Sequence, residues 1–465
     1  MNPQKTVGVL TDTEILLVDV VQGKRALRSI LLPPRMSELS GLLEHLWQAG
    51  LTEVWVMPAT ICSQTATCAW FDQVQSHWTV IVHADSREPT RPLEAVLWPK
   101  GSGYRDERRL AIVFPEYAGW DWVLPDARSL LATVTYLDQT LARPLTDAPN
   151  LVAHRVLTDL TRDQAASWLG SPPVDPRTLL SSDGVPIPLL ESARDILWMR
   201  PLTRVEQHQR YLHKYTHLSR YLQACIGLQL GTGVPQYSSN GRACDDIRPG
   251  IWRVSAERAG SLFDGKRLPS CLDGEWMSTP QVKCCRDIGY QVQVREGYYW
   301  PASHELLKGW ATTLWQAGEY LHTHPQKFRH GQGRANTDHT IKLLAELGVS
   351  ILAQEKTLGG WSRPDCWAQI LGRSQAILFA DLAGLVRKGT MPVLVDRDAL
   401  WVVSNDPNPL TAVPGLVTTP RWRGYTVGYE VPLALTREVK EAFRITEQAA
   451  QLISTLDTLA GEVFP

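Results

Sequence analysis

The chain lacks several features that would assign it to a class at once. Its eight cysteines show no Cys-x-x-Cys spacing, and Cys284 and Cys285 are adjacent, which suits neither a zinc site nor a bridge between them. No apolar run reaches the length that spans a bilayer, because even residues 376–386 carry Asp381. The start of the chain lacks the long apolar core of a signal peptide. We therefore expect a cytoplasmic protein with reduced thiols and no membrane partner.

Composition sets wide limits on partners. The 465 residues suffice for two or three domains, each with its own core. Charged residues make up 20% and hydrophobic residues 44%, which is typical of a globular chain rather than a disordered one. The net charge of −1 gives no overall positive field, so a nucleic-acid partner must be held by local basic patches. The 18 tryptophans can stack on bases, although packing is their commoner role.

Residues 1–170 alternate between strand and helix patterns. Helical spacing covers residues 37–49 and 126–141, and short apolar runs predict strands at 14–21, 28–33, 54–57, 79–83 and 110–114. This alternation predicts an α/β layer with a mixed sheet.

Asp19, after the first of these strands, is similar to the first acid of RNase H-like and exonuclease sites. The residue two positions on is Val21, which cannot bind metal, and the geometry of Asp121 and Asp126 is left open. We therefore expect an RNase H-like or exonuclease-like scaffold without nuclease activity.

A proline-rich stretch at 171–205 predicts a linker, because prolines stiffen a segment and exclude helix and inner-strand structure. Residues 206–435 then form an α+β domain, and residues 436–465 a C-terminal helix. Helices of this half are expected at 205–228, 304–321, 340–352 and 365–388, and strands near Gly250 and at 391–403. Residues 282–294 are expected to form a helix followed by another strand.

The pair Asp396 and Asp398 lies between two apolar runs. Side chains alternate faces along a strand, so acids one residue apart point the same way at a strand end or hairpin tip. Carboxylates so placed can share divalent metal ions, as two-metal phosphoryl transfer requires. The alternative is a hairpin turn whose acids face water.

Six phrases of the second half occur in a specific order: Pro249-Gly-Ile-Trp-Arg-Val, Glu275-Trp-Met-Ser-Thr-Pro, Gly289-Tyr-Gln-Val-Gln-Val-Arg-Glu-Gly-Tyr-Tyr-Trp-Pro, Ile341-Lys-Leu-Leu, Trp361-Ser-Arg-Pro-Asp and Pro392-Val-Leu-Val-Asp-Arg-Asp. In these phrases the chain resembles the telomere-associated proteins of linear actinobacterial replicons and related phage and Chloroflexi sequences. The resemblance covers residues 195–430. The amino-terminal helix-turn-helix of that family has no counterpart here.

The same order is similar to the palm of protein-primed family B DNA polymerases. That resemblance implies a first acid in the segment 215–222, a lysine at Lys342, and the Asp396/Asp398 hairpin. At the first position this chain has Thr216, whose hydroxyl cannot hold a divalent cation as a carboxylate does. Relatives carry arginine and asparagine where this chain has Gln375, Ile377 and Ala380, and Asp245 and Asp246 lie in a loop, the wrong context for the lost acid. The resemblance implies a polymerase-like fold whose active site has decayed, with Asp396 and Asp398 as vestigial catalytic and metal residues.

Three basic clusters are candidates for nucleic-acid binding. Their members are Lys327, Arg329, Arg334 and Lys342 around Gly331 and Gly333, then Lys356, Trp361 and Arg363, and finally Arg421 and Arg423. Glycine lets a backbone approach a phosphate, the cations neutralise it, and tryptophan beside arginine can stack a base. The alternatives are a solvated loop for the first cluster and a helix start for the second.

We expect a non-catalytic protein that binds DNA or RNA and works with protein partners in a nucleoprotein complex of a telomere, of replication, or of a defence or mobile element. It would need no cofactor. One rival is an active polymerase or nuclease that uses Asp396 and Asp398 with Mg²⁺. The other is a structural adaptor whose tryptophans form protein interfaces.

Overall fold

The computed structural model describes residues 7–11, 14–21, 24–31, 39–57, 71, 75, 78–84, 92–100, 109–114, 120, 122, 126–141, 145, 149–162, 179–184, 187, 196–257, 276–324, 331–354, 362–417, 425–427, 432–445 and 448–463. The chain forms two compact units: residues 1–159 with 316–348, and residues 160–315 with 349–465. The first unit thus includes a segment that the sequence had assigned to the second domain. The chain leaves the first unit before the proline-rich stretch and later returns to it.

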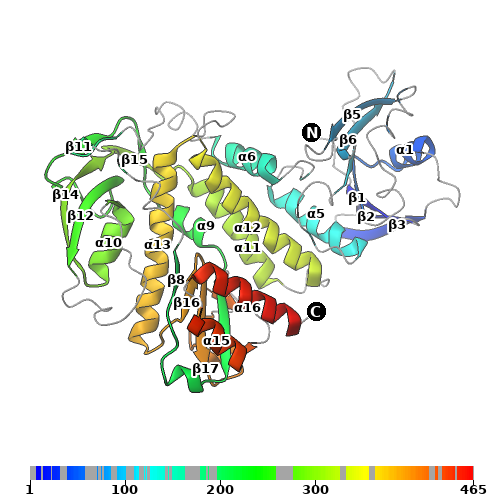
Figure 1. Ribbon diagram of the computed structural model, residues 1–465. Coiled ribbons are helices and arrows are strands. Elements are labelled where there is room, and N and C mark those ends of the chain that lie inside the picture. The colour runs from blue at the N-terminus through cyan, green and yellow to red at the C-terminus, as the bar shows by residue number, and fades with distance from the viewer. Residues whose placement is uncertain are drawn as a thin grey trace. The chain divides into compact units, whose positions relative to one another are not determined.

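The first unit contains a seven-stranded mixed sheet in the order β3-β2-β1-β4-β7-β6-β5. Its strands β1, β2, β3, β5 and β6 are labelled in Figure 1. β1, β2 and β3 are antiparallel neighbours, whereas β1 pairs with β4, and β4 with β7, in parallel. The mixed α/β layer predicted from the sequence is confirmed. The strands are β1 (Val7–Leu10), β2 (Glu14–Val21), β3 (Lys24–Leu31), β4 (Glu53–Val56), β5 (Trp78–Ala84), β6 (Pro92–Pro99) and β7 (Leu110–Val113).

Helix α5 (Ala127–Leu141) links the two segments of this unit. Two hydrogen bonds from α5 and one from the preceding Trp122 join the segments. Tyr136 Oη donates to Ala317 O at 2.7 Å, Thr133 Oγ1 to Gly333 O at 3.1 Å, and Trp122 Nε1 to Thr340 Oγ1 at 2.8 Å. The later segment comes from α11 (Lys308–Thr323) and α12 (Gly331–Ala353). Helix α1 (Leu39–Gln48) was predicted from the sequence, whereas helix α6 (Pro149–Leu160) was not.

Asp126 has a structural role at the start of α5. Its Oδ1 accepts from Ser129 N at 2.8 Å and its Oδ2 from Ser129 Oγ at 2.9 Å, which satisfies an otherwise unpaired amide of the first turn. Asp19 lies within β2, and Asp121 falls outside the described residues. Asp126 is therefore engaged as a helix cap.

The second unit contains an antiparallel sheet in the order β11-β14-β12-β13. Its strands are β11 (Gln236–Ser238), β12 (Gly250–Glu257), β13 (Trp276–Ser278) and β14 (Gln291–Tyr299), and α10 (Thr279–Asp287) follows β13 directly. Ser278 and Gln281 form a capping box that starts α10, and Pro280 suits its first turn. A two-stranded pair joins β10 (Leu230–Thr232) to β15 (Ala302–His304).

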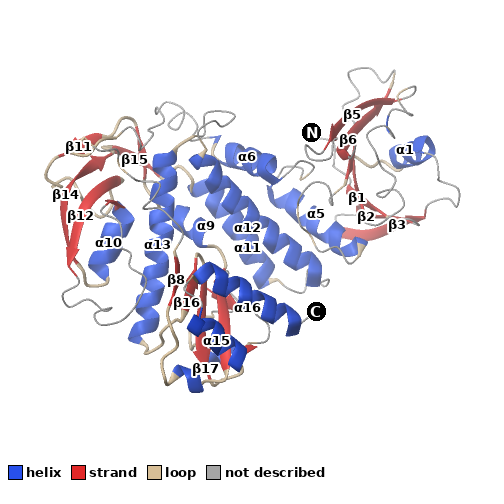
Figure 2. Cartoon of the chain, viewed as in Figure 1, coloured by secondary structure: helices blue, strands red, loops and turns tan. Residues whose placement is uncertain are grey.

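A second sheet of this unit has the order β18-β9-β17-β16-β8, with β19 also paired to β9. Its strands β8, β16 and β17 are labelled in Figure 2. Its strands are β8 (Leu197–Met199), β9 (Tyr211–His217), β16 (Leu394–Asp396), β17 (Ala399–Ser404), β18 (Tyr425–Val427) and β19 (Leu433–Ala434). The helix expected at 205–228 is wrong. A short 3-10 turn η3 (Glu206–His208), strand β9 and helix α9 (Arg220–Cys225) occupy that region.

Helix α13 (Pro364–Arg387) packs against both α9 and α10. Gly372 permits the approach to α10, because a Cβ there would lie 1.9 Å from Ser278 Oγ. The core around α13 joins Leu378, Phe379 and Leu382 to Trp252 of one sheet and Leu400 of the other. Burial of this apolar surface is the main stabilising contribution of the unit.

Helices α15 (Arg437–Ile445) and α16 (Ala449–Val463) cover the other side of the second sheet, through Val439, Phe443 and Leu452 against Trp401 and Leu394. The sequence predicted one terminal helix there. A short helix α14 (Pro409–Ala412) follows β17. In the described part of the chain, no helix combines the length and apolarity that crossing a membrane requires.

Candidate functional site

Asp396 and Asp398 lie at the tip of a tight hairpin, as predicted. Asp396 ends β16 and pairs with Ala399 of β17, so Arg397 and Asp398 form a two-residue loop. Arg397 has φ of 46°, the positive value that the first position of such a loop needs. Arg397 Nε also contacts Asp396 Oδ1 at 3.3 Å.

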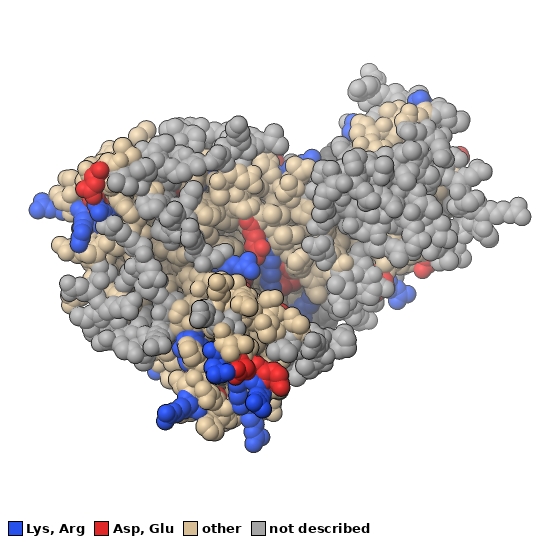
Figure 3. Space-filling model, in the orientation of Figure 1, with Lys and Arg blue, Asp and Glu red and all other residues tan. Residues whose placement is uncertain are grey.

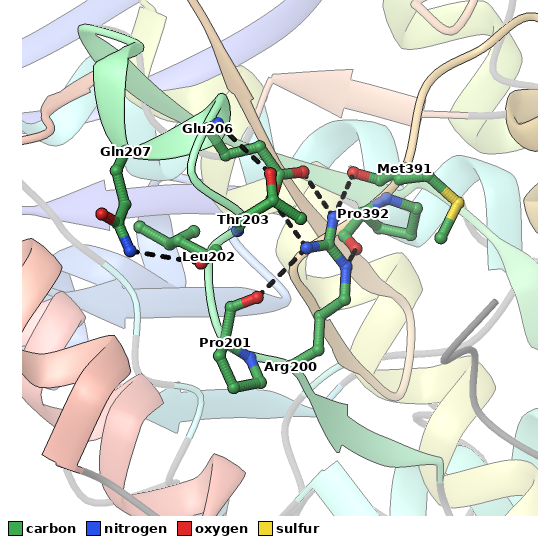
Figure 4. A network of polar contacts seen from close by, with 8 residues as sticks. All are labelled: Arg200, Pro201, Leu202, Thr203, Glu206, Gln207, Met391 and Pro392. Carbon is green, nitrogen blue, oxygen red and sulfur yellow. Dashed lines mark hydrogen bonds and ion pairs between the residues drawn. The ribbon is translucent and has the colours of Figure 1, made fainter.

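A buried arginine anchors the strand that leads to this hairpin (Figure 4). Arg200 Nε donates to Pro392 O at 3.0 Å, and Arg200 Nη2 donates to Met391 O at 3.3 Å. Its guanidinium also grips Glu206 in a bidentate pair, with Nη1 to Oε2 at 2.7 Å. Burial raises the pKa of Glu206, but Arg200 and the hydrogen bonds with Thr203 together outweigh burial and hold that pKa below the ordinary value. The start of β16 is therefore fixed by charge-assisted hydrogen bonds.

Strand β9 lies beside the hairpin and carries no acid there. Its Thr216 is paired with Ala399, and His217 N donates to Asp398 O at 2.7 Å. Strand β18 is on the other side of β9, with Tyr425 paired to His217. A neutral hydroxyl therefore occupies the strand position next to the two acids.

Arg220 begins α9, three residues beyond His217, and is buried with 5% of its surface exposed. Its Nε has no hydrogen-bond partner in the part of the chain that the structure describes. Burial raises the pKa of Asp398, Asp381 and Tyr425, and the charge of Arg220 opposes that rise in all three. We call Arg220, Asp381, Asp398 and Tyr425 the arginine cluster.

The charge of Arg220 is nevertheless insufficient to offset the effect of burial on the two acids of the arginine cluster. Burial raises the pKa of Asp381 to about 6, against the opposing effects of Tyr425 and Arg220. Burial likewise raises the pKa of Asp398, with Arg220 opposing. The Tyr425 hydroxyl is buried and has no hydrogen bond of regular geometry among the described residues, although it lies near Asp381. One guanidinium thus serves two partly desolvated carboxylates.

The arginine cluster does not suit a divalent cation. No group of three or more His, Cys, Asp or Glu side chains is placed to hold a metal within the described ranges. Asp245 and Asp246 do not complete such a set: Asp245 Oδ1 accepts from Ile247 N at 2.9 Å, and Asp246 pairs with Arg286 at 3.2 Å. A buried guanidinium also repels a metal ion. These residues do not fit Mg²⁺.

Two predicted nucleic-acid-binding residues, Arg334 and Lys342, belong to a network of the first unit. Lys342 Nζ contacts Asp338 Oδ2 at 2.7 Å, His322 Nε2 contacts Asp338 Oδ1 at 3.3 Å, and Arg334 Nη2 contacts His322 Nδ1 at 3.0 Å. Burial raises the pKa of Asp338, but His322 and Lys342 outweigh it and lower that pKa well below the ordinary value. We call these four residues the Asp338 network. They join α11 to α12.

Arg363 requires a correction, because it is not a surface residue. It is 1% exposed and binds Asp365 with Nε at 2.9 Å and Nη2 at 2.8 Å, while Nη2 also donates to Gly231 O at 2.6 Å. A guanidinium engaged in this way holds α13 to β10 and cannot stack on a base. The other predicted binding residues, Lys327, Arg329, Lys356, Trp361, Arg421 and Arg423, lie outside the described residues.

Sequence reasoning missed Arg220, Asp381 and Tyr425. Arg220 and Asp381 carry no local signal, because sheet register and helix packing bring them together over long sequence separations. The spacing Arg363-Pro-Asp365 did carry a signal, since an acid two residues after an arginine can form an internal pair.

No protein-family model matches the chain, and no curated protein matches it. Among solved structures, the chain is similar to Phi29 DNA polymerase complexed with primer-template DNA, at 9% identity and a TM-score of 0.44 over 92% of this chain and 86% of that one. The same polymerase with primer-template DNA and incoming nucleotide gives 10% identity and a TM-score of 0.42, over 91% and 84% of the two chains. Its complex with single-stranded DNA gives 10% and 0.39 over the same shares.

Proposed function

We propose that the chain is a cytoplasmic, non-catalytic nucleic-acid-binding protein with a degenerate family B polymerase-like fold. It acts with protein partners in a nucleoprotein complex of a telomere, of replication, or of a defence or mobile element. The observation that carries this proposal is the buried Arg220 beside Asp398 and Asp381, next to a strand that presents Thr216. A two-metal enzyme needs carboxylates on both sides of its cations, whereas the arginine cluster contains a fixed cation, Arg220.

We also propose that the first unit is an RNase H-like domain. Three antiparallel strands, β3-β2-β1, continue into β4 and β7, which run parallel to β1. This is the strand arrangement expected of an RNase H-like sheet. Its candidate acid Asp126 caps a helix, which favours a scaffold without nuclease activity.

Exposed cations of the second unit supply a surface for phosphates. Figure 3 shows Lys and Arg side chains gathered over the lower lobe, around β17 and α15, with acids among them. Exposed Arg204 and Arg210 flank η3 and β9, and Arg210 O accepts from Leu435 N at 2.7 Å, close to exposed Arg437. Arg444 pairs with Glu441, so Arg204 and Arg210 are the better candidates for phosphate binding.

Filter binding to single- and double-stranded DNA and RNA across a salt series tests the proposal. We expect binding at low salt that weakens as salt rises, because each phosphate contact releases a counterion. The double variant Arg204→Gln, Arg210→Gln should reduce the salt dependence. Loss of binding to every nucleic acid at low salt, alone and with partners, would reject the proposal and favour the structural adaptor.

Primer-extension and nuclease assays with Mg²⁺ and Mn²⁺ test the non-catalytic part separately. We expect no product. A reaction that the wild type performs and Asp398→Asn abolishes would show that the site is an active enzyme.

A further inference from the structure

A cavity of about 410 Å³ lies between α10 and α13 in the second unit, apart from the Asp396/Asp398 hairpin residues. This volume is within the range of small-molecule sites. Its walls are mainly apolar: Pro280 and Ile288 belong to α10, and Ala376, Ile377 and Ala380 to α13. Two apolar helix faces of small and branched side chains form a slot suited to a flat ring.

The charged side chains that line this cavity form ion pairs, except that of Arg373. Lys283 Nζ contacts Asp287 Oδ2 at 2.7 Å, and Asp246 Oδ1 accepts from Arg286 Nη1 at 3.2 Å. Arg373 makes no hydrogen bond or ion pair to any residue that the structure describes. The lining therefore keeps one positive charge without a direct partner.

The guanidinium of Arg373 lies at the rim formed by Gly227. A Cβ built on Gly227 would be 3.9 Å from Arg373 Nη2 and 3.8 Å from Glu305 Oε1. Glu305 is already paired, because its Oε2 accepts from Lys308 Nζ at 2.6 Å. Burial lowers the pKa of Arg373 despite the opposing effects of Cys225 and Glu305, which indicates a guanidinium that water solvates incompletely. An incoming anion would compensate it.

We propose that this cavity binds one nucleotide of a single-stranded nucleic acid, with the base between the apolar walls and the phosphate on Arg373. The choice of a nucleotide over another apolar anion rests on the proposed nucleic-acid function. A guanidinium presents paired N–H donors that match two phosphate oxygens, and a base gains affinity from apolar contact on both faces. The cavity would thus supply a contact to the base, whereas the exposed arginines of the proposed binding surface contact only phosphates.

Calorimetric titration of the full chain with AMP, CMP, GMP and UMP tests this inference. At least one monophosphate should bind, and adenosine and inorganic phosphate alone should bind at least about tenfold more weakly, since each supplies half of the contact. Arg373→Gln should weaken the monophosphate about tenfold or more, as expected for a lost charge-assisted hydrogen bond. Arg373→Lys should restore part of that loss. Arg387→Gln, an exposed arginine on the same helix, is the matched control and should leave binding unchanged.

Three results would overturn the inference: no monophosphate binding at millimolar concentration, equal binding of hexanoate, or binding that Arg373→Gln leaves unchanged. Oligonucleotide binding by the wild type, measured in parallel, separates this failure from that of the proposed function. An oligonucleotide that binds while no monophosphate does rejects the cavity alone. Monophosphate binding that depends on Arg373, with no oligonucleotide binding, rejects the nucleic-acid function alone.

Discussion

The Asp338 network of the first unit and the arginine cluster of the second are both built from partly buried acids and basic side chains, but they treat the acids in opposite ways. Asp338 has two basic partners, His322 and Lys342, and its pKa falls well below the ordinary value. Asp381 shares Arg220 with Asp398, and its pKa rises to about 6. Burial acts upward on all three acids, so the number of basic partners decides the direction.

In its charged form Asp338 therefore stabilises the fold, whereas the charged forms of Asp381 and Asp398 destabilise it. The Asp338 network holds two helices together through fully formed contacts. The arginine cluster leaves a buried guanidinium nitrogen and a buried hydroxyl without regular hydrogen bonds among the described residues. Under-compensated buried charges are commoner at functional sites than elsewhere.

The largest expected effect is from Asp338→Asn. It removes the charge that His322 and Lys342 share, and should destabilise the chain by about 2 kcal/mol at pH 7, between the values typical of exposed and buried pairs. Because the folded-state pKa of Asp338 lies below its unfolded value of about 3.9, the contribution is present above that pH and is lost as pH falls further. Urea unfolding from pH 3 to 8 measures both.

The matched control for Asp338→Asn is Asp287→Asn, which breaks an exposed pair with Lys283. We expect less than about 0.5 kcal/mol there. Equal losses in the two variants would show that the Asp338 network contributes no more than a surface pair.

Asp381→Asn should have the opposite sign and stabilise the chain by about 1–2 kcal/mol at pH 8, a value reduced for partial exposure. The folded chain holds the Asp381 proton more tightly than the unfolded chain, so wild-type stability falls as pH rises from about 4 to 6. The advantage of the variant should therefore appear across that window and be absent at pH 4. Thermal unfolding at pH 4 and 8 gives the comparison. A variant that is less stable at pH 8 would mean that Arg220 needs the Asp381 charge more than burial opposes it.

The smallest effect is expected from Lys342→Met, which keeps the apolar stem and removes one partner of Asp338. Stability should fall by about 0.5 kcal/mol, and the acid-induced loss of stability should begin at a higher pH because the pKa of Asp338 rises. Denaturant titration at pH 4 and 7 measures the change. If oligonucleotide affinity falls instead while stability is unchanged, Lys342 contacts phosphate, as the sequence first suggested.

The sequence predicted those parts of the fold that depend on local pattern. Apolar runs on both sides of Asp396 and Asp398 were sufficient to predict the hairpin, and helical spacing was sufficient for α5, α11 and α13. For α12 only the later part, 340–352, was predicted; the loop expected around Gly331 and Gly333 is wrong, because the helix begins at Gly331. Strand β9 was taken for a helix, because polar residues such as His213 and His217 interrupt the alternation of apolar residues. The structure buries both histidines by pairing β9 on both edges.

Only some residues of the candidate site could be predicted from the sequence. Its acids at 396 and 398 have a local signature, whereas Arg220 becomes a partner of Asp398 only after β9 and β17 pair. Of the two alternatives for Arg363, base stacking and a helix start, the structure supports the second: α13 begins directly after Arg363, whose charge is buried against Asp365. The sequence shows which charged residues are candidates for phosphate binding, but tertiary contacts decide whether their side chains are exposed.

The division of the first unit between residues 1–159 and 316–348 has a consequence for synthesis. The hydrogen bonds of Trp122, Thr133 and Tyr136 form with partners that leave the ribosome only after the whole of the second unit's first segment, residues 160–315. During translation the sheet must therefore persist with α5 incompletely covered, exposed to chaperones and to wrong pairings. A fragment that stops at residue 159 would carry the same exposed surface permanently.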